Sequence, residues 1–375
     1  MRTPEAIETL GAAMRVGVLG GGQLGRMLAL AGYPLGIRTA LYDPTPDACA
    51  GQVAPLISAP YDDLDALARF AENKACLTYE FENVPLAAAQ FLAERVSLHP
   101  APRALEIFQD RLQEKQFLRS VGVPTPTFAP IDPAAPEAAL HITGLPCVVK
   151  TRRLGYDGKG QGVAHTAQEF HALVQRFQPH PLIAEAFVPF DREVSAIGVR
   201  AHDGQIAVYP IVENHHDGGV LRLSVVNPDD ALNEQGQARA YLTRLLETLD
   251  YVGVMALEMF QVGNQLLANE VAPRVHNSGH WTIEGAETSQ FENHLRAILG
   301  LPLGSVAPRG YSAMVNLIGA IPPIEPILQI PNAHLHLYGK SPRPGRKVGH
   351  ITLRTDTREA LEQQLIPLME ILSAR

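Results

Sequence analysis

Two glutamates twelve residues apart are the side chains of this sequence best placed to do chemistry together. Glu258 and Glu270 each lie in an apolar run that is typical of a β-strand, and Gly263-Asn264 between the runs indicates a turn. A hairpin would bring the two carboxylates together across adjacent strands, where like charges repel each other. A divalent cation would relieve that repulsion, and carboxylates with phosphate oxygens are typical ligands of Mg²⁺ bound with ATP. A solvated edge hairpin with two unrelated acids is the alternative on spacing alone.

Upstream, a lysine and a glycine-rich run could hold the phosphates of a nucleotide. Lys150 ends the apolar run 146–150, and a lysine at a strand end is a suitable point charge for ATP phosphates. The run 152–162 follows, with four glycines and several basic side chains, among them Lys159. Such a loop can fold over a triphosphate with its backbone N–H groups pointing inwards. Taken alone, the lysine could equally lie at the surface, and the loop could be a hairpin tip.

Two further acids fit the sugar and the base of the same nucleotide. Glu185 lies in the apolar run 182–189, whose backbone could read the adenine edge, and Glu193 follows eight residues later. A carboxylate just beyond the strand could accept hydrogen bonds from the two ribose hydroxyls. For Glu193 alone, an acid on an exposed strand face is the simpler interpretation.

The N-terminal region carries a different phosphate signal. Gly20, Gly22 and Gly25 match G-x-G-x-x-G between a strand and a helix, and Asp43 ends the next strand. This pattern is close to the dinucleotide-binding fingerprint and, taken alone, would indicate an NAD enzyme. A glycine turn at a helix start could instead admit a smaller phosphate ester, with Gln23 placed to hydrogen-bond it, or could be a purely structural turn.

The elements that would position these residues alternate between strands and helices, which predicts a mostly parallel, open α/β sheet at the N-terminus. The predicted strands are 15–19, 39–43 and 75–79, and the predicted helices are 26–31, 64–73, 85–94 and 103–121. A Pro/Ala-rich connector at 124–136 leads to a second α/β region over about 147–299. The last segment has short strands at 314–318, 334–338 and 349–354 and a helix from about residue 357. We therefore predict a disordered extension over 1–13, with Met14 as an alternative start, and α/β domains over 14–115, 116–308 and 309–375.

Composition excludes several classes of protein. A chain of 375 residues is too long for one small core, and its net charge of −8 argues against non-specific nucleic-acid binding. Cys49, Cys76 and Cys147 are widely spaced and contain no CxxC pair, which argues against a disulfide framework or a zinc site and indicates a reducing compartment. No apolar run approaches the length of a membrane span, so we expect a cytoplasmic protein without membrane contact.

The order of the nucleotide-binding features is more specific than any one of them. A strand lysine, a glycine loop, a strand with an acid, a second acid and paired carboxylates near Asn269 follow one another over about residues 111–294. This layout resembles the ATP-grasp fold.

Several stretches resemble one ATP-grasp family in particular, the 5-(carboxyamino)imidazole ribonucleotide synthases of purine biosynthesis. The stretches are 20–27, 79–84, 110–116, 155–161, 269–281 and 338–350, and the likeness runs from about residue 15 almost to the C-terminus. The resemblance implies a homodimeric ATP-grasp ligase with an N-terminal pre-ATP-grasp α/β domain, an ATP-grasp domain with a lid subdomain and a small C-terminal domain. It implies the conversion of ATP, bicarbonate and aminoimidazole ribonucleotide (AIR), through carboxyphosphate, into the N-carboxylated nucleotide, ADP and phosphate.

The same resemblance assigns site residues. ATP would be bound by Arg111, Lys150, Gly155, Tyr156, Asp157, Gly158, Lys159, Gly160, Gln161, Glu185, Ala186, Phe187, Val188, Glu193, His216, Asn269 and Glu270. AIR or bicarbonate would lie among Gln23, Leu24, Glu82, Tyr156, Asp157, Arg274, His276, Lys340, Arg346 and Lys347. Glu258 and Glu270 would hold Mg²⁺, and Asp157, Lys159 and Arg274 would be catalytic, with Asp157 as a candidate base.

Two departures and three rival hypotheses accompany this interpretation. Ala272 stands where many ATP-grasp enzymes have an asparagine, which puts a third metal ligand in doubt. Lys159 stands where some relatives carry arginine, so charge is kept but bidentate geometry is not. The rivals are an ATP-grasp enzyme that uses formate and glycinamide ribonucleotide, an NAD-dependent dehydrogenase built on the glycine loop, and a catalytically silent nucleotide-binding regulator.

Overall fold

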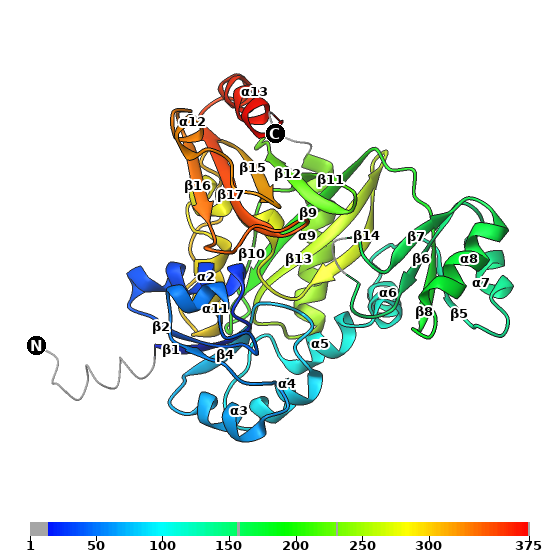
Figure 1. Cartoon of the computed structure of the whole chain (residues 1–375), viewed down its shortest axis with the longest axis horizontal. Helices are drawn as coiled ribbons and strands as arrows, with labels where there is room; N and C mark the ends of the chain where they lie inside the picture. The colour runs from blue at the N-terminus through cyan, green and yellow to red at the C-terminus, as the bar shows by residue number, and fades with distance from the viewer. Residues whose placement is uncertain (1–13, 156–157, 230–231, 374–375) are drawn as a thin grey trace, which may run out of the picture.

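The computed structural model describes residues 14–155, 158–229 and 232–373, which form three β-sheets and the helices that flank them (Figure 1). The expectations for the extension 1–13, for Tyr156 and for Asp157 lie outside the described residues. None of the described helices has the length and apolar character that a membrane span requires.

The N-terminal sheet is parallel, as the alternating pattern predicts, with the strand order β3-β2-β1-β4. Its strands are β1 (Arg15–Leu19), β2 (Arg38–Tyr42), β3 (Leu56–Ile57) and β4 (Cys76–Tyr79), and its helices are α2 (Gln23–Gly32), α3 (Leu64–Ala71) and α4 (Leu86–Ala93). Short 3-10 turns lie at η1 (Tyr33–Leu35) and η2 (Cys49–Gln52). The strands are apolar because one face packs against α2 and the other against α3 and α4.

The single helix predicted over 103–121 is wrong, because the chain forms two helices there. They are α5 (Pro102–Phe108) and α6 (Arg111–Ser120). The break follows from Asp110, whose Oδ1 accepts hydrogen bonds from the backbone N–H groups of Leu112 and Gln113 at 3.0 and 3.5 Å. An aspartate that caps a helix in this way starts a new helix. Arg111 thereby becomes the first residue of α6.

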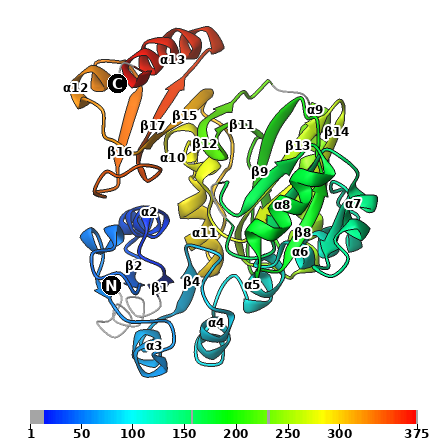
Figure 2. The same ribbon diagram turned by 45° about the vertical axis from the view of Figure 1, so that its right-hand side comes forward.

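The central sheet is antiparallel and nine-stranded, in the order β14-β13-β9-β11-β12-β15-β17-β16, with β10 paired to β9. Its strands from the middle of the chain are β9 (Arg192–Arg200), β10 (Ile206–Val208), β11 (Val212–Asp217), β12 (Val220–Val226), β13 (Gly253–Val262) and β14 (Gln265–Ala272). The helix α9 (Leu232–Thr248) packs on one face and α11 (Gln290–Ile298) on the other. Figure 2 shows α11 between the central sheet and the N-terminal sheet, where it also contacts α2.

The last segment continues the central sheet. Strand β15 (Tyr311–Ile318) pairs with β12 and with β17 (Lys347–Thr355), and β17 pairs with β16 (Ala333–Leu337). The helices α12 (Ile324–Leu328) and α13 (Arg358–Ser373) pack on these strands, and η3 (Asn277–Gly279) and α10 (Thr282–Gly285) precede α11. Hydrogen bonds between β12 and β15 join the last segment to the middle of the chain in one sheet. The domain boundary at 308/309 therefore stays a prediction.

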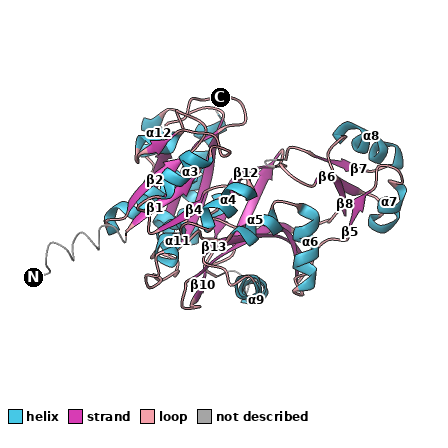
Figure 3. Ribbon diagram, turned by 90° about the horizontal axis from the view of Figure 1, so that it is seen from below, coloured by secondary structure: helices cyan, strands magenta, loops and turns pink. Residues whose placement is uncertain are grey.

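A third, smaller sheet stands to one side of the central sheet, with α6 between them (Figure 3). Its order is β5-β8-β6-β7, formed by β5 (Phe128–Ile131), β8 (Leu182–Ala186), β6 (Cys147–Thr151) and β7 (Gln161–Ala164). The helices α7 (Glu137–Thr143) and α8 (Ala167–Phe177) cover it. The predicted connector at 124–136 therefore holds a strand, β5, which pairs with β8.

Candidate active site

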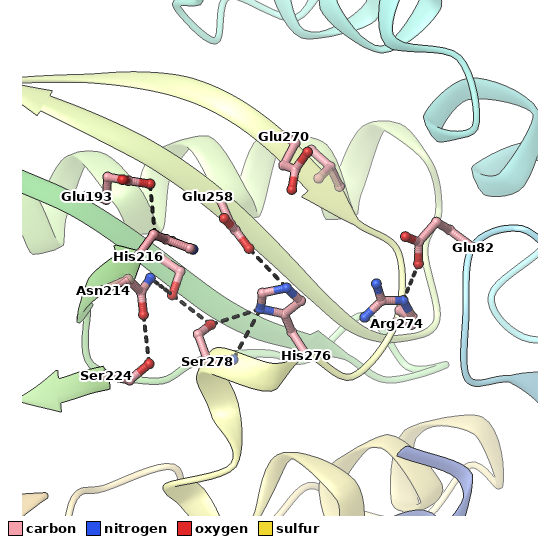
Figure 4. A network of polar contacts seen from close by, with 12 residues as sticks. Glu82, Glu193, Asn214, His216, Ser224, Glu258, Glu270, Arg274, His276 and Ser278 are labelled. Carbon is pink, nitrogen blue, oxygen red and sulfur yellow. Dashed lines mark hydrogen bonds and ion pairs between the residues drawn. The ribbon is translucent and has the colours of Figure 1, made fainter. Parts of the chain in front are cut away.

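The paired glutamates lie on adjacent strands of one hairpin, as the sequence predicts, and directly opposite each other. Glu258 on β13 and Glu270 on β14 are cross-strand partners (Figure 4). The register then shifts so that Met259 faces Ala268, which leaves Asn269 as the extra residue of a β-bulge. The bulge turns the end of β14 so that Glu258, Asn269 and Glu270 all line one cavity.

Each of these carboxylates has its own nitrogen partner. Glu258 Oε1 lies 2.9 Å from His276 Nε2, and Glu270 Oε2 lies 2.8 Å from Arg111 Nη1. Enclosure by the cavity walls opposes ionisation of Glu270, but the Arg111 guanidinium outweighs it and holds the pKa of the carboxyl at about 2. Both acids can therefore stay close together.

The strand lysine joins a buried cluster of charges. Lys150 Nζ and Lys115 Nζ lie 3.0 and 3.2 Å from the same oxygen, Glu185 Oε2. Burial opposes ionisation of Glu185, but the two ammonium groups outweigh burial and hold the pKa of this carboxyl at about 2. Lys115 is fully buried and also donates to the backbone oxygen of Asn269 at 2.7 Å. A single lysine thus connects the small sheet to the bulge beside Glu270.

Helix α6 connects the two sheets through its first residues as well. Arg111 donates to the backbone oxygen of Gly155 at 3.3 Å, in addition to its bond with Glu270. The Asp110 carboxylate pairs with Arg152 at 2.8 Å and with Arg153 at 3.3 Å. The charges at the start of α6 therefore hold the glycine-rich run and the hairpin against the same helix.

Two aromatic rings and a histidine line the cavity together with residues that the sequence predicts to bind ATP. Phe190 and Phe260 stack with ring centroids 4.9 Å apart, and both line the cavity. Glu193 Oε2 lies 3.1 Å from His216 Nδ1. Burial favours the neutral ring, but Glu193 outweighs burial and raises the pKa of His216 above its usual range.

The backbone N–H groups of Ala186 and Phe187 are already bonded to the carbonyls of Thr127 and Pro146, at 2.7 and 3.0 Å.

The glycine loop binds carboxylates of the protein itself. Glu80 accepts from the backbone N–H of Gly22 and, at 2.6 Å, from that of Gly25. Asp43 Oδ2 accepts from the N–H of Gly21 at 2.7 Å. These side chains occupy the N–H groups that a dinucleotide or a smaller phosphate ester would need. The NAD hypothesis and the phosphate-ester hypothesis for these N–H groups are therefore disfavoured.

The residues predicted to bind AIR or bicarbonate come from the N-terminal region, the middle and the last segment of the chain. Arg274 Nε is bonded to Glu82 Oε2, which joins the end of β14 to the loop after β4 (Figure 4). Gln23, the first residue of α2 rather than a loop residue, accepts from Lys340 Nζ. Arg346 donates to the backbone oxygen of Ser341 at 3.2 Å.

The cavity has a volume of about 860 Å³ and brings most of the predicted residues together. Predicted residues that line it are Gln23, Leu24, Glu82, Arg111, Lys150, Gly155, Gly158, Lys159, Gln161, Phe187, Glu193, His216, Glu258, Asn269, Glu270, Arg274, His276 and Lys347. Described residues that were predicted but lie outside the lining are Gly160, Glu185, Ala186, Val188, Lys340 and Arg346. Glu185 and Lys340 reach lining residues through Lys150 and Gln23.

Comparison with known proteins places this geometry in one family. The chain matches models of the ribonucleotide synthetase preATP-grasp domain over residues 13–109, the ATP-grasp domain over 116–291 and the phosphoribosylaminoimidazole carboxylase C-terminal domain over 312–364. An N5-carboxyaminoimidazole ribonucleotide synthase of Pseudomonas aeruginosa is 50% identical over 362 residues, which cover 96% of this chain and 100% of that protein. The chain belongs to the N5-carboxyaminoimidazole ribonucleotide synthase family.

Solved structures of this synthase family share the whole fold. The enzyme of Thermus thermophilus superposes with a TM-score of 0.92 at 58% identity, and the match covers 95% of this chain and 98% of that one. The enzyme of Aspergillus clavatus in complex with ADP and 5-aminoimidazole ribonucleotide gives a TM-score of 0.90 at 30% identity, over 96% and 99% of the two chains. The ATP-grasp fold that the sequence resembles is thereby confirmed.

Sequence reasoning missed several residues of the site in this member of the synthase family. Phe190, Phe260 and Glu114 line the cavity, and Lys115 lies behind it. Burial raises the pKa of the Glu114 carboxyl to about 8, and its Oε1 accepts from the Val271 N–H at 2.6 Å. Lys115 lies four residues after Arg111, so the two share one face of a helix. This spacing is the sequence signal that could have placed Lys115 near the site.

Proposed function

We propose that the protein carboxylates AIR with bicarbonate at the expense of ATP, in de novo purine biosynthesis. Bicarbonate takes the γ-phosphoryl group of ATP to give carboxyphosphate and ADP, and the AIR amine then takes the carboxyl group, directly or as CO2, with release of phosphate. The observation that carries the proposal is the single cavity lined both by the nucleotide candidates Lys150 and Glu270 and by the substrate candidates Glu82 and Arg274. The Aspergillus relative, described with ADP and AIR, supports it.

The residues of the hairpin suit Mg²⁺. Glu258 and Glu270 offer hard oxygen ligands side by side, and the buried Oδ1 of Asn269, the bulge residue next to Glu270, has no hydrogen-bond partner among the described residues. We propose that the two glutamates hold the cation, which neutralises phosphate charge when bound. Arg111, the present partner of Glu270, would then be released towards the phosphates, while His276 keeps its bond to one oxygen of Glu258.

The remaining residues have separate roles in this proposal. Lys150, Lys159 and Arg274 spread the negative charge that develops during phosphoryl transfer. Glu193 accepts from the ribose hydroxyls, while Phe190 and Phe260 offer an apolar wall for the adenine ring. Asp157 as the base for the AIR amine stays a prediction. Carboxyphosphate hydrolyses in water, so the run 152–162 would have to cover it during turnover.

Three further expectations belong to the same proposal. The protein would act as a homodimer, would be cytoplasmic, and would be divided at 115/116 and 308/309. Cys49, Cys76 and Cys147 are all buried and unpaired, which agrees with a reducing compartment.

ADP release by purified protein tests the reaction. With Mg²⁺–ATP and bicarbonate, we expect release to rise sharply only when AIR is added. Replacement of AIR and bicarbonate by glycinamide ribonucleotide and formate tests the sister enzyme, and nucleotide binding without turnover in either mixture would favour the silent regulator.

Arg274→Lys is expected to lower kcat/KM for AIR by about 10- to 100-fold while KM for ATP changes by less than about 2-fold. Lysine keeps the charge but cannot reproduce the planar donor set that meets Glu82. Steady-state kinetics with each substrate varied in turn give both constants. Arg309→Lys is the matched control, because Arg309 pairs with Glu287 at the surface, away from the cavity lining. An equal loss in both variants would contradict the assignment of Arg274.

A further inference from the structure

A line of hydrogen bonds runs from Glu258 into the interior of the central sheet (Figure 4). His276 Nδ1, on the side of the ring away from Glu258, lies 2.9 Å from Ser278 Oγ. Ser278, Ser195 and Ser224 are fully buried, and Asn214 is 5% exposed. The inner links are Ser278 Oγ to Ser195 Oγ at 2.8 Å, Ser195 Oγ to Asn214 Nδ2 at 3.0 Å, and Asn214 Oδ1 to Ser224 Oγ at 2.8 Å.

The direction of the first bonds follows from the carboxylate. An ionised Glu258 can only accept, so His276 Nε2 must carry the hydrogen and donate. In a neutral imidazole, Nδ1 is then an acceptor. The backbone N–H of Ser278, 3.3 Å from Nδ1, agrees with the same assignment, because it too can donate to that nitrogen.

The rest of the line can then be oriented in only one way. Ser278 donates its hydroxyl hydrogen to His276 and so accepts from the Ser195 hydroxyl. Ser195 in turn accepts from the Asn214 amide, which leaves the Asn214 carbonyl to accept from Ser224. Every donor in the line therefore points towards Glu258. Buried hydroxyls are costly unless bonded, so a change at one link is felt at the next.

We propose that Ser195, Asn214 and Ser224 are positioning residues that fix His276 as an Nε2–H donor towards Glu258. Their side chains do not line the cavity, and the line of side-chain hydrogen bonds reaches it through Ser278 and His276. His276 then orients Glu258 Oε1 and leaves the other carboxylate oxygen for a cation or substrate. It also follows that His276 serves as a donor at Nε2 and not as the base for the substrate amine. This inference deepens the proposed function and rests on it for its kinetic test alone.

Ser195→Ala removes the donor to Ser278 and frees the Ser278 oxygen to accept from an Nδ1–H. We expect a second His276 tautomer to appear and kcat to fall about 10-fold, the size of effect typical for residues that orient a metal ligand. KM for ATP should change by less than about 2-fold, because Lys150, Glu193 and the stacked phenylalanines are untouched. Ser224→Ala, two links further away, should give a smaller loss in the same direction and carries the test if Ser195→Ala does not fold.

Ser312→Ala is the matched control. Ser312 is a fully buried serine on β15, the strand next to β12, and its hydroxyl has no hydrogen-bond partner within the described part of the chain. Its removal should leave kcat and the tautomer unchanged.

The tautomer is read by nitrogen NMR of isotope-labelled histidines, with the His276 signals identified by their loss in His276→Gln. A single Nε2–H tautomer and wild-type kcat in Ser195→Ala would overturn the proposal, as would a changed tautomer with unchanged kcat. An equal loss in Ser312→Ala would assign the effect to packing. The NMR arm needs no turnover, so it separates failure of this inference from failure of the proposed reaction.

Discussion

Glu270→Gln is expected to lower AIR-dependent ADP release by about 100- to 1,000-fold, the cost of losing one preorganised electrostatic group in a phosphoryl-transfer site. Glutamine keeps the shape and one oxygen but removes the charge that faces Glu258 and Arg111. Arg111 would lose the carboxylate that it pairs with, and a cation would lose one of two ligands. Stopped-time assays at saturating substrates over a series of Mg²⁺ concentrations measure both the loss and any shift in metal requirement.

Glu258→Gln should behave in the same way, since the two carboxylates face one position. Glu287→Gln is the control, because Glu287 is a half-exposed partner of Arg309 outside the cavity lining. Full turnover in both hairpin variants would refute the metal assignment. It would favour the alternative of a solvated edge hairpin with two unrelated acids.

Lys115→Met is expected to destabilise the fold by about 3–5 kcal/mol, the usual cost of removing one partner from a buried ion pair. The fully buried ammonium bonds both to Glu185 and to the bulge carbonyl of Asn269. Without it, Glu185 keeps only Lys150, which can no longer turn to a nucleotide without leaving a buried carboxylate unpaired. We therefore also expect KM for ATP to rise about 10-fold or more. Urea denaturation and steady-state kinetics measure the two effects.

The double variant Lys115→Met/Glu185→Gln should regain part of the lost stability and of the ATP affinity, because neither charge is then left alone. Lys74→Met, at a partly exposed lysine outside the cavity lining, should change neither quantity by much. If the double variant is no better than Lys115→Met, the shared carboxylate is not the reason for the loss.

Local patterns in the sequence predict much of this molecule. The hairpin and its turn follow from apolar runs on either side of Gly263-Asn264, whereas the register that pairs Glu258 with Glu270 depends on the bulge at Asn269. Lys150 lies near the end of β6 and Glu193 near the beginning of β9, as their neighbours in the sequence indicate. Such features are readable because they depend on residues within one or two elements.

Contacts between distant elements are less readable. Gly22 and Gly25 look ready for a phosphate, but the carboxylate that occupies their N–H groups comes from Glu80, more than fifty positions away. The cluster around Glu185 depends on how α6 lies between two sheets, which no local pattern predicts. The helix predicted over 103–121 divides for a local reason, because Asp110 caps the start of α6.

The central sheet has a consequence for how this protein can be divided. Strand β15 of the last segment is the only strand among the described residues that pairs with the outer side of β12, so a chain cut near residue 310 would expose the unpaired backbone of β12. A bare strand edge invites pairing with other chains and aggregation. The C-terminal region, although matched by a separate family model, therefore covers a strand edge of the preceding part of the chain. Chimaeras between relatives should take these two regions from the same parent.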